Sequence, residues 1–480
     1  MEITPIGFLF LLVILFLLCR KKHQFENLIV LCVITEIFIE MGFVFSVGTS
    51  TFFYSALIED VIVIYSLFHI PSIRKRTDKT WGILIICYFV PVVLLALFPS
   101  NELVTPSGVR WDDVVFEGES LTRPVVNGTV LKMTTKFSIY TVMAIYANAT
   151  FTTHHYQRIL HKLSIGMKFF LILGIAEFVI KNILDGNTIW GHTLETLFGT
   201  SEFTVYEARL RGGTYELNLF TKEASHYAYA LFLMPIIILA DNLIQGKKNG
   251  ISLSIFICII LSLISTSFST LLFVFAFFYI FLLYRWGIQK PKTMKIEKIL
   301  LTIGIIVVLS FTTIILTMYS DGFVTGRLLN LTENFSDFAT TDVQYRGNDS
   351  GDSSTQIRTL SIIQTLLTFL SRPVFGVSLM STSSHGATSL LLEGIGIVGV
   401  YFWTRCYFFL CPLKQVLTPQ KTLFLLSIII FFCVNLLNSL VLRPFYELTA
   451  YTMAICFIFI FSPFNLSSNA HTRKQNAKDI

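Results

Sequence analysis

The chain has 480 residues, of which 54% are hydrophobic and only 14% are charged. Soluble domains usually carry about 25% charged residues, so this composition argues against a soluble fold and predicts an integral membrane protein. The formal net charge is +6. The basic residues nevertheless lie in short clusters between apolar runs, which argues against a nucleic-acid partner.

An all-α, polytopic membrane fold is predicted from the apolar runs. A transmembrane helix needs roughly 17 to 25 predominantly apolar residues, and the chain offers about 12 to 13 such runs. They lie near residues 3–19, 26–46, 50–70, 81–98, 136–152, 164–183, 223–245, 251–266, 268–285, 299–318, 386–410, 422–441 and 444–462. The chain starts Met1-Glu2 without a basic segment, so we expect the first run to be a retained span.

All eight cysteines lie within these runs or at their ends. We therefore interpret them as small packing residues, and we expect neither a disulfide framework nor a zinc site.

The loops between the runs alternate in charge. Lysines and arginines gather in the loops that begin near Arg20, Arg74, Arg158, Lys247, Arg285, Lys414 and Arg473. By the positive-inside rule these loops are cytoplasmic, which places the N-terminus outside and the C-terminus in the cytoplasm. Three longer stretches of mixed charge, residues 99–135, 184–222 and 319–385, then face outward, where long loops often carry function.

Five parts follow from this topology. Residues 1–183 form N-terminal transmembrane helices with one outer loop, 184–222 an outer Arg-Gly loop, 223–318 central transmembrane helices, 319–385 a large outer loop, and 386–480 C-terminal transmembrane helices with a cytoplasmic tail. In the large loop, residues 355–370 repeat apolar side chains at helical spacing. They predict an amphipathic helix on the outer membrane face. Residues 342–354, rich in Gly, Asp and Ser, predict a flexible connector that could act as a lid.

A first group of candidate site residues spans the end of the second outer loop and the start of the next run. It comprises Arg209, Arg211, Gly212, Gly213, Glu223 and His226. Arginine presents a fixed fork of donors that matches phosphate oxygens, and adjacent glycines let a backbone approach a bulky ligand, so a diphosphate suits this loop. The alternative is a solvated loop followed by a charged helix start. The functional interpretation is favoured because Glu223 and His226 lie where loop meets membrane.

A second group gathers around the eleventh run and comprises Arg358, Arg372, His385 and Glu393. A histidine with a pKa near neutrality can move a proton or hydrogen-bond a phosphate; its alternative is an interfacial side chain satisfied by backbone. Gly394, Gly396 and Gly399 imitate a dinucleotide fingerprint. They lie inside a span without a preceding strand, so they predict close helix packing instead. Arg443, in the last short outer turn, adds a cation on the same side.

Several acidic residues fall inside predicted spans, among them Glu36, Glu40, Glu59, Asp60 and Glu177. A charge that faced lipid would be costly, so these residues pair between helices or form the proton path of a transporter. Pairing near the outer mouth, for example between Glu40 and Glu177, is favoured, because we identify no Lys or Arg partner beside these acids within the spans.

Together these residues resemble the bacterial O-antigen polymerase and ligase superfamily, over about residues 200 to 400. Its members carry an Arg-Gly-rich outer loop that runs into a span beginning with Glu, as Arg211-Gly212-Gly213 and Lys222-Glu223-Ala224-Ser225 do here. The family's usual proline after that glutamate is Ala224 in this chain. A late outer Arg, a Pro-x-x-Gly element, a His and a Glu-Gly span follow in the family order as Arg358, residues 373–376, His385 and residues 393–394. A Ser-rich turn, here residues 265–270, is also typical.

The resemblance implies a metal-independent, GT-C-like membrane glycosyltransferase of the bacterial cytoplasmic membrane that needs no cofactor. Its donor and acceptor are oligosaccharides on undecaprenyl diphosphate, and a chain-length regulator and a flippase are candidate partners. Arg211 and Arg358 are expected to stabilise the departing diphosphate, and either Glu223 or His385 to accept the proton of the acceptor hydroxyl. The expected substrate-binding residues are Arg209, Gly212, Gly213, His226, Arg372 and Arg443.

Two alternatives remain open. A ligase would use the same chemistry, but long outer loops of mixed charge suit a particular repeat unit and favour a polymerase. A lipid-linked oligosaccharide flippase would line a central cavity with charge, yet such transporters usually have two similar halves and short outer loops, and neither is evident here.

Overall fold

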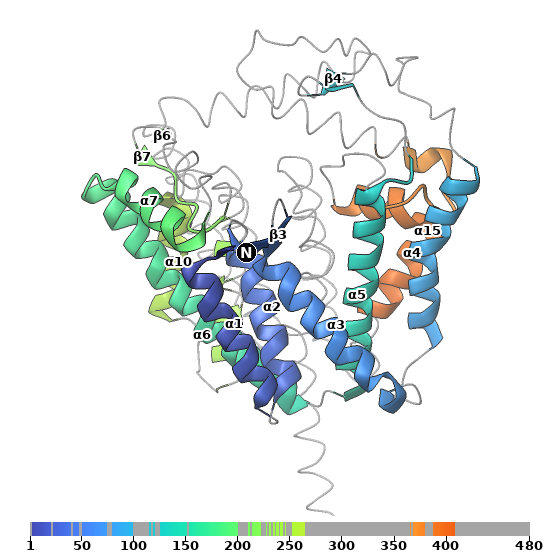
Figure 1. The fold of residues 1–480 in the computed structure, drawn as a ribbon, viewed down its shortest axis with the longest axis horizontal. Helices are drawn as coiled ribbons and strands as arrows, with labels where there is room; N and C mark the ends of the chain where they lie inside the picture. Colours follow the sequence, from blue (N-terminus) through green and yellow to red (C-terminus); the bar gives the residue numbers. More distant parts are fainter. Residues whose placement is uncertain are drawn as a thin grey trace, which may run out of the picture.

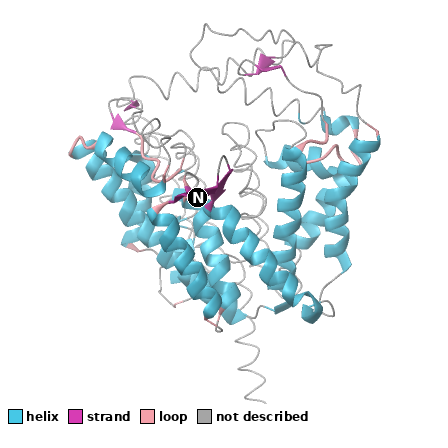
Figure 2. Ribbon diagram, viewed as in Figure 1, coloured by secondary structure: helices cyan, strands magenta, loops and turns pink. Residues whose placement is uncertain are grey.

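The computed structural model describes residues 2–20, 23–39, 42–47, 50–73, 79–98, 115–116, 119–120, 125–150, 153–199, 210–211, 214–221, 252–264, 368–379 and 387–408, together with scattered positions between 227 and 245 and residue 365. This part of the chain is mostly helical, as predicted, and its few strands are short (Figure 2).

The helices form two groups joined by α3 (Tyr54–Ile73) (Figure 1). One group holds α1 (Pro5–Cys19), α2 (Gln24–Phe38), α6 (Thr153–Phe178) with its π-helical continuation η4 (Val179–Ile183), α7 (Asn187–Phe198) and α10 (Leu253–Ile264). The other holds α4 (Lys79–Leu97), α5 (Gly128–Thr150) and α15 (Ala387–Phe408). Helix α3 packs on α2 and on α5, so it links the two groups.

Seven short strands accompany the helices in the described part of the chain. β1 (Glu2–Ile3), β2 (Phe43–Val47) and β3 (Ser50–Phe53) form an antiparallel sheet of order β1-β2-β3. Two small hairpins pair β4 (Val115–Phe116) with β5 (Glu119–Ser120), and β6 (Leu210–Arg211) with β7 (Thr214–Tyr215).

Thr4 joins the first sheet to α1. Its hydroxyl donates to the Phe43 carbonyl at 2.9 Å and accepts from the Gly7 amide at 2.9 Å, while its own amide donates to Val44 at 3.1 Å. Threonine at the N-cap followed by proline at the first helical position is a favoured helix start. One residue therefore fixes both the end of β1 and the start of α1.

The predicted bounds of the second and third runs were wrong. Helix α2 ends at Phe38 and α3 begins at Tyr54, and the intervening residues form β2 and β3. Phe43 to Val47 and Ser50 to Phe53 are rich in aromatic and β-branched residues, which suit a pleated strand. A hydropathy window counts such residues as part of a span because it ignores their two-residue period.

Other predicted bounds agree more closely. Helices α1, α4, α10 and α15 match the runs 3–19, 81–98, 251–266 and 386–410 within a few residues, whereas α5 and α6 begin at Gly128 and Thr153, before the predicted 136 and 164. The predicted loop 184–222 contains helix α7 and the β6–β7 hairpin. Of the amphipathic helix predicted over 355–370, positions 365 and 368–370 are helical and the rest lies outside the described residues. The runs at 268–285, 299–318, 422–441 and 444–462 also lie outside them.

Two helical segments within the described residues, Lys79–Leu97 and Arg158–Ile183, are long and apolar enough to cross a membrane by length and composition. Buried core helices of soluble proteins can meet the same two criteria.

Candidate functional site

The arginine-glycine motif of the first candidate group lies in the β6–β7 hairpin. Leu210 pairs with Tyr215 and Arg211 with Thr214, so Gly212 and Gly213 are the two residues between the strands. The register places Arg211 at the end of β6, where the chain turns back into β7.

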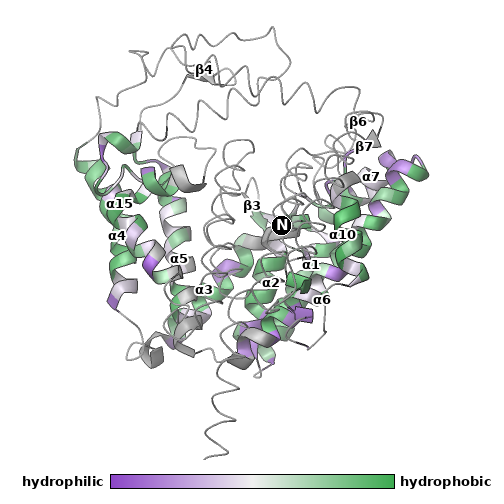
Figure 3. Cartoon of the chain, turned by 180° about the vertical axis from the view of Figure 1, so that it is seen from behind, coloured by the Kyte–Doolittle hydropathy of each residue, from purple (hydrophilic) through white to green (hydrophobic). Residues whose placement is uncertain are grey.

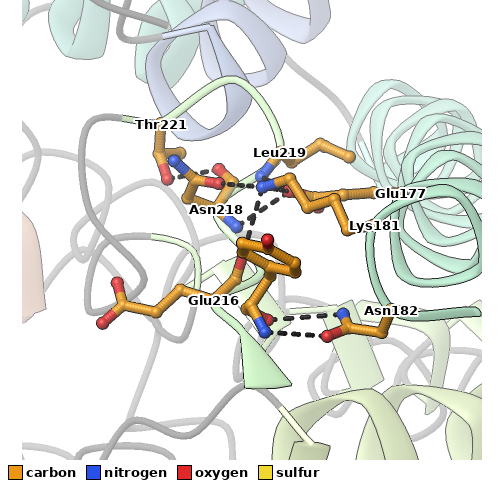
Figure 4. Close-up of polar contacts among 8 residues, drawn as sticks. Glu177, Lys181, Asn182, Glu216, Asn218, Leu219 and Thr221 are labelled. Carbon is orange, nitrogen blue, oxygen red and sulfur yellow. Dashed lines mark hydrogen bonds and ion pairs between the residues drawn. The ribbon is translucent and has the colours of Figure 1, made fainter. Parts of the chain in front are cut away.

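A buried ion pair lies beside the base of this hairpin (Figure 4). The Lys181 ammonium in η4 is 2.8 Å from the Glu177 carboxylate in α6, and both side chains are fully buried. Lys181 also donates to the Glu216 carbonyl at 3.0 Å and to the Asn218 side-chain oxygen at 2.9 Å. The Lys181 ammonium thus connects α6 to the segment that follows β7.

The Glu177 carboxylate binds the backbone of the same segment. It accepts hydrogen bonds from the amides of Asn218 at 3.1 Å and Leu219 at 3.0 Å. Leu219 has a φ of +50°, a left-handed conformation that is unusual for a leucine. Two successive amides that converge on one carboxylate form a concave anion site, so Glu177 stabilises the turn at these residues.

Asn182 fixes the hairpin strand itself. Its side-chain oxygen accepts from the Tyr215 amide at 2.8 Å, and its side-chain nitrogen donates to the Tyr215 carbonyl at 3.4 Å. Lys181 and Asn182 of the π-helical turn η4 thus contact neighbouring parts of the segment. π-Helical turns next to α-helices are frequent at functional sites. Phe220 then packs between Phe170 of α6 and Phe198 of α7.

The absence of a basic partner for Glu177 was a wrong inference from the sequence. Lys181 follows Glu177 by four positions, the spacing that brings two side chains together on one helix. The predicted pairing of Glu177 with another helix was also wrong, since Lys181 lies one turn further along the same helical segment, in η4. Glu59 is buried and Asp60 exposed, while Glu40 and the Glu36 side chain lie outside the described residues.

The second candidate group is described at residues 372–379 and along α15. The Arg372 guanidinium donates a hydrogen bond to the carbonyl of Phe98, just beyond α4. Helix α15 is interrupted at Gly396, where the backbone has φ +62° and ψ −174°. The segment 373–377 lies against this break.

The backbone groups freed by the break are satisfied by that segment. The amides of Ile397 and Val398 donate to Pro373 at 2.9 Å and Val374 at 3.1 Å, and the Val377 amide donates to Glu393 at 2.6 Å. In an unbroken helix the Ile397 amide would donate to the Glu393 carbonyl. The Pro373-to-Val377 segment thus replaces helical hydrogen bonds of α15.

Three glycines permit this contact. A Cβ on Gly376, whose φ is +78°, would lie 2.4 Å from the Glu393 carbonyl, and one on Gly396 would lie 2.5 Å from Val374. A Cβ on Gly394 would lie 2.5 Å from the Leu379 side chain. These glycines were predicted to permit close packing of helices, but the element that approaches Gly394 and Gly396 is the segment 373–379 and not another helix.

The β6–β7 hairpin of the first candidate group and the segment 372–379 of the second lie at the same end of the molecule (Figure 1). They lie beside different sets of helices, the hairpin beside α7 and the segment beside α4. Of the predicted site residues, the structure describes the strand position of Arg211, the contact of Arg372 and the buried Glu393 of α15, whose carbonyl accepts from Val377. The others lie outside the described residues: Arg209, Gly212, Gly213, Glu223, His226, Arg358, His385 and Arg443. The sequence analysis missed Lys181, Asn182 and Asn218.

A third polar cluster lies at the opposite end of α6. Arg158 donates two hydrogen bonds to the buried Glu26 carboxylate, at 2.7 and 3.1 Å, and His23 and His155 lie 3.1 and 3.5 Å from it. Lys162 donates to Asn27. These contacts connect α2 to α6. Among the described residues, no group of three or more His, Cys, Asp or Glu side chains is placed to hold a metal ion.

No family model, curated protein or solved structure matches this chain.

Proposed function

We propose that the chain is a multi-spanning membrane glycosyltransferase that polymerises undecaprenyl-diphosphate-linked oligosaccharide repeat units at the outer face of the bacterial cytoplasmic membrane. The observation that carries this proposal is the fixed position of the arginine hairpin. Arg211 stands beside a tight turn whose base is held by a buried polar network, and Glu223 follows two residues after Thr221, the last residue of that held segment.

Exposed apolar side chains support the membrane part of the proposal. Residues at helical spacing are exposed along α1 (Phe8, Leu12 and Phe16, 47–61%) and along α6 (Ile165, Phe169 and Ile172, 53–63%). Figure 3 shows this hydrophobic character along the helices. Glu177 and Lys181, in contrast, are fully buried. A lipid environment favours this arrangement, in which apolar side chains face outward and paired charges are buried inside.

Paired charges lie near the two ends of the membrane-length segment that α6 and η4 form. Arg158 and Lys181 are 23 residues apart (181 minus 158), or roughly 35 Å along a helix, slightly more than the ~30 Å hydrocarbon thickness. A further cation, Lys168, lies between them and is partly buried. The separation of the two paired clusters suits a helix that crosses a membrane.

The proposed reaction needs no metal. The acceptor sugar hydroxyl attacks the anomeric carbon of the donor and forms a new glycosidic bond, while the bond from that carbon to the diphosphate oxygen breaks. The hydroxyl proton passes to Glu223 or His385, and undecaprenyl diphosphate departs with the bonding electrons. Arg211 and Arg358 stabilise the charge that develops on the departing oxygen. A ligase would use the same groups with a different acceptor.

Deletion of the gene in its host, followed by gel analysis of surface polysaccharide, tests the proposal. A product with a single repeat unit is expected from loss of a polymerase. Long polymer that is not attached to its final acceptor would indicate a ligase, and repeat units retained on the cytoplasmic side would indicate a flippase. Either result would overturn the polymerase assignment.

Complementation with variants then tests the arginines. Arg211→Ala and Arg358→Ala are each expected to reduce polymer at least about a hundredfold, as loss of one charge-stabilising donor commonly does, at normal protein level in the membrane. Lysine should rescue poorly because a point charge cannot bind phosphate in two places. Lys132→Ala, which removes an exposed cation from α5, is the control and should leave polymer unchanged. Full activity of an alanine variant would remove that arginine from the mechanism.

A further inference from the structure

The Glu177–Lys181 pair makes most of its hydrogen bonds outside its own helix. A glutamate and a lysine four positions apart stabilise an exposed helix slightly, but these two side chains are fully buried. A buried pair is favourable only when further hydrogen bonds satisfy its remaining atoms. Here residues 216–219 supply such hydrogen bonds to both members of the pair. The pair is therefore arranged to bind this segment.

The segment adopts a backbone turn that needs this support. Leu219 is in the left-handed region, where a side chain clashes with its own backbone, so the conformation persists only when its surroundings stabilise it. The Glu177 carboxylate accepts from both Asn218 and Leu219 at this turn. The turn sets the direction in which the chain continues from β7 toward Glu223.

Arg211 and Glu223 are both joined to this held segment by short stretches of chain. Asn182 holds Tyr215 and Glu177 holds Leu219. Arg211 precedes Tyr215 by four residues (215 minus 211), and Glu223 follows Leu219 by four (223 minus 219). Four residues span at most about 14 Å, so neither group lies farther than that from a fixed point.

We infer that Glu177, Lys181 and Asn182 are positioning residues for the diphosphate site, because they hold the segment that carries Arg211 on one side and Glu223 on the other. Their effect on sugar transfer rests on the proposed function. Their effect on the hairpin does not, and it is measurable without any substrate.

A charge exchange on the full-length protein separates this role from plain helix stabilisation. Glu177→Lys combined with Lys181→Glu keeps the four-residue pair and the net charge. It turns an ammonium toward the Asn218 and Leu219 amides and a carboxylate toward the Glu216 carbonyl, so donors face donors and acceptors face acceptors. We expect trypsin to cleave after Arg211 about tenfold faster than in the wild type, since several hydrogen bonds of the hairpin base are lost. Wild-type resistance in the exchanged protein would overturn the inference.

Asn182→Ala decides the question if the exchanged protein does not accumulate, because it removes the two hydrogen bonds to Tyr215 and leaves the ion pair intact. Its control is Asn127→Ala, which removes another hydrogen bond from an asparagine to a backbone amide, that of Val130 at 2.9 Å, away from the hairpin. Asn182→Ala should accelerate cleavage after Arg211 and raise the KM for the lipid-linked donor about tenfold, and Asn127→Ala should do neither.

The same measurements distinguish the two ways of being wrong. Loss of active protein without a change in KM, together with unchanged cleavage, would reduce Asn182 to a structural residue and overturn the inference. Faster cleavage in a protein whose wild type transfers no sugar would leave the positioning of the hairpin intact and overturn the proposed function.

Discussion

Two acidic side chains, Glu26 and Glu177, are almost completely buried, and each is surrounded by donors from a distant part of the chain. Glu26 of α2 binds Arg158 of α6, 132 positions away, and Glu177 binds the backbone of residues 218 and 219. Removing one partner of a fully buried pair such as Glu177–Lys181 typically costs about 3–5 kcal/mol, because the other charge is then left without compensation. At the scale of single residues, these carboxylates connect segments that are far apart in the sequence.

The sequence contained part of this information. The four-residue spacing of Glu177 and Lys181 is visible in the printed chain, so this pair could have been predicted although it was not. The contacts of the pair with residues 216–219 could not, because they depend on a distant segment of the chain. Asn182 and Asn218 could not be singled out from the sequence, because a single asparagine is also a typical residue of an ordinary turn.

The two candidate bases give a prediction at this scale. Glutamine keeps the shape of glutamate and loses only proton acceptance, so Glu223→Gln should abolish turnover and leave donor binding intact. His385→Gln should weaken donor binding and retain slow turnover, because a histidine beside arginines serves more readily as a phosphate donor than as a strong base. Donor binding and single-turnover transfer, measured on both variants, separate the roles. A Glu223→Gln protein that transfers at nearly the wild-type rate would refute Glu223 as the base.

Helix α15 shows, at the scale of one element, why a predicted span need not be a continuous helix. Its apolar composition was sufficient to predict the run 386–410, which matches the observed Ala387–Phe408. The break at Gly396 could not be predicted, because hydropathy averages over the whole run. An interrupted helix is tolerated where its freed backbone groups find partners, and Pro373, Val374 and Val377 supply them. The Pro-x-x-Gly element and the glycines of α15 are therefore one structural unit.

Gly396→Ala tests this unit. The alanine would need a φ of +62° with an extended ψ, a region almost restricted to glycine, and its Cβ would lie 2.5 Å from the Gly376 amide and the Val374 carbonyl. We expect a loss of about 3 kcal/mol in the free energy of unfolding, from backbone strain and overlap together. The measurement is the Tm of the purified protein in detergent.

Gly82→Ala is the matched control, because a Cβ at this position in α4 meets no atom within 4 Å. Replacing a helical glycine at such a site usually stabilises a protein by ~0.4–1 kcal/mol. Equal Tm values for the two variants would show that the contact between residues 373–377 and α15 contributes nothing to stability.

At the scale of the whole molecule, polar clusters lie at both ends of α6, and some of the charges from which the membrane orientation is predicted also make structural contacts. Arg158 and Lys162 were counted as cytoplasmic markers, yet they bind Glu26 and Asn27. The alternation of basic loops could be read from the sequence because it depends only on composition. The short sheets, helix α7 and the hairpin could not, because they lie in segments whose length and polarity are also those of ordinary loops.

Reporter fusions along the full chain test the orientation on which the proposed site depends. Fusions after Lys75, Lys248, Lys295 and Lys478 should report the cytoplasm, and fusions after Asp113, Tyr206 and Asp349 the outside, since the basic loops remain on the cytoplasmic side. Helix α6 supplies an internal check. Its Arg158 cluster and the hairpin that follows Tyr206 are separated by one membrane-length helix, so fusions near these two points must report opposite sides. Alkaline phosphatase activity and green fluorescence, measured on paired fusions at each site, give complementary signals. A cytoplasmic signal at Tyr206 or Asp349 would place the arginine hairpin or the large loop on the cytoplasmic side, whereas the lipid-linked donor is at the outer face. The proposed site would then be wrong.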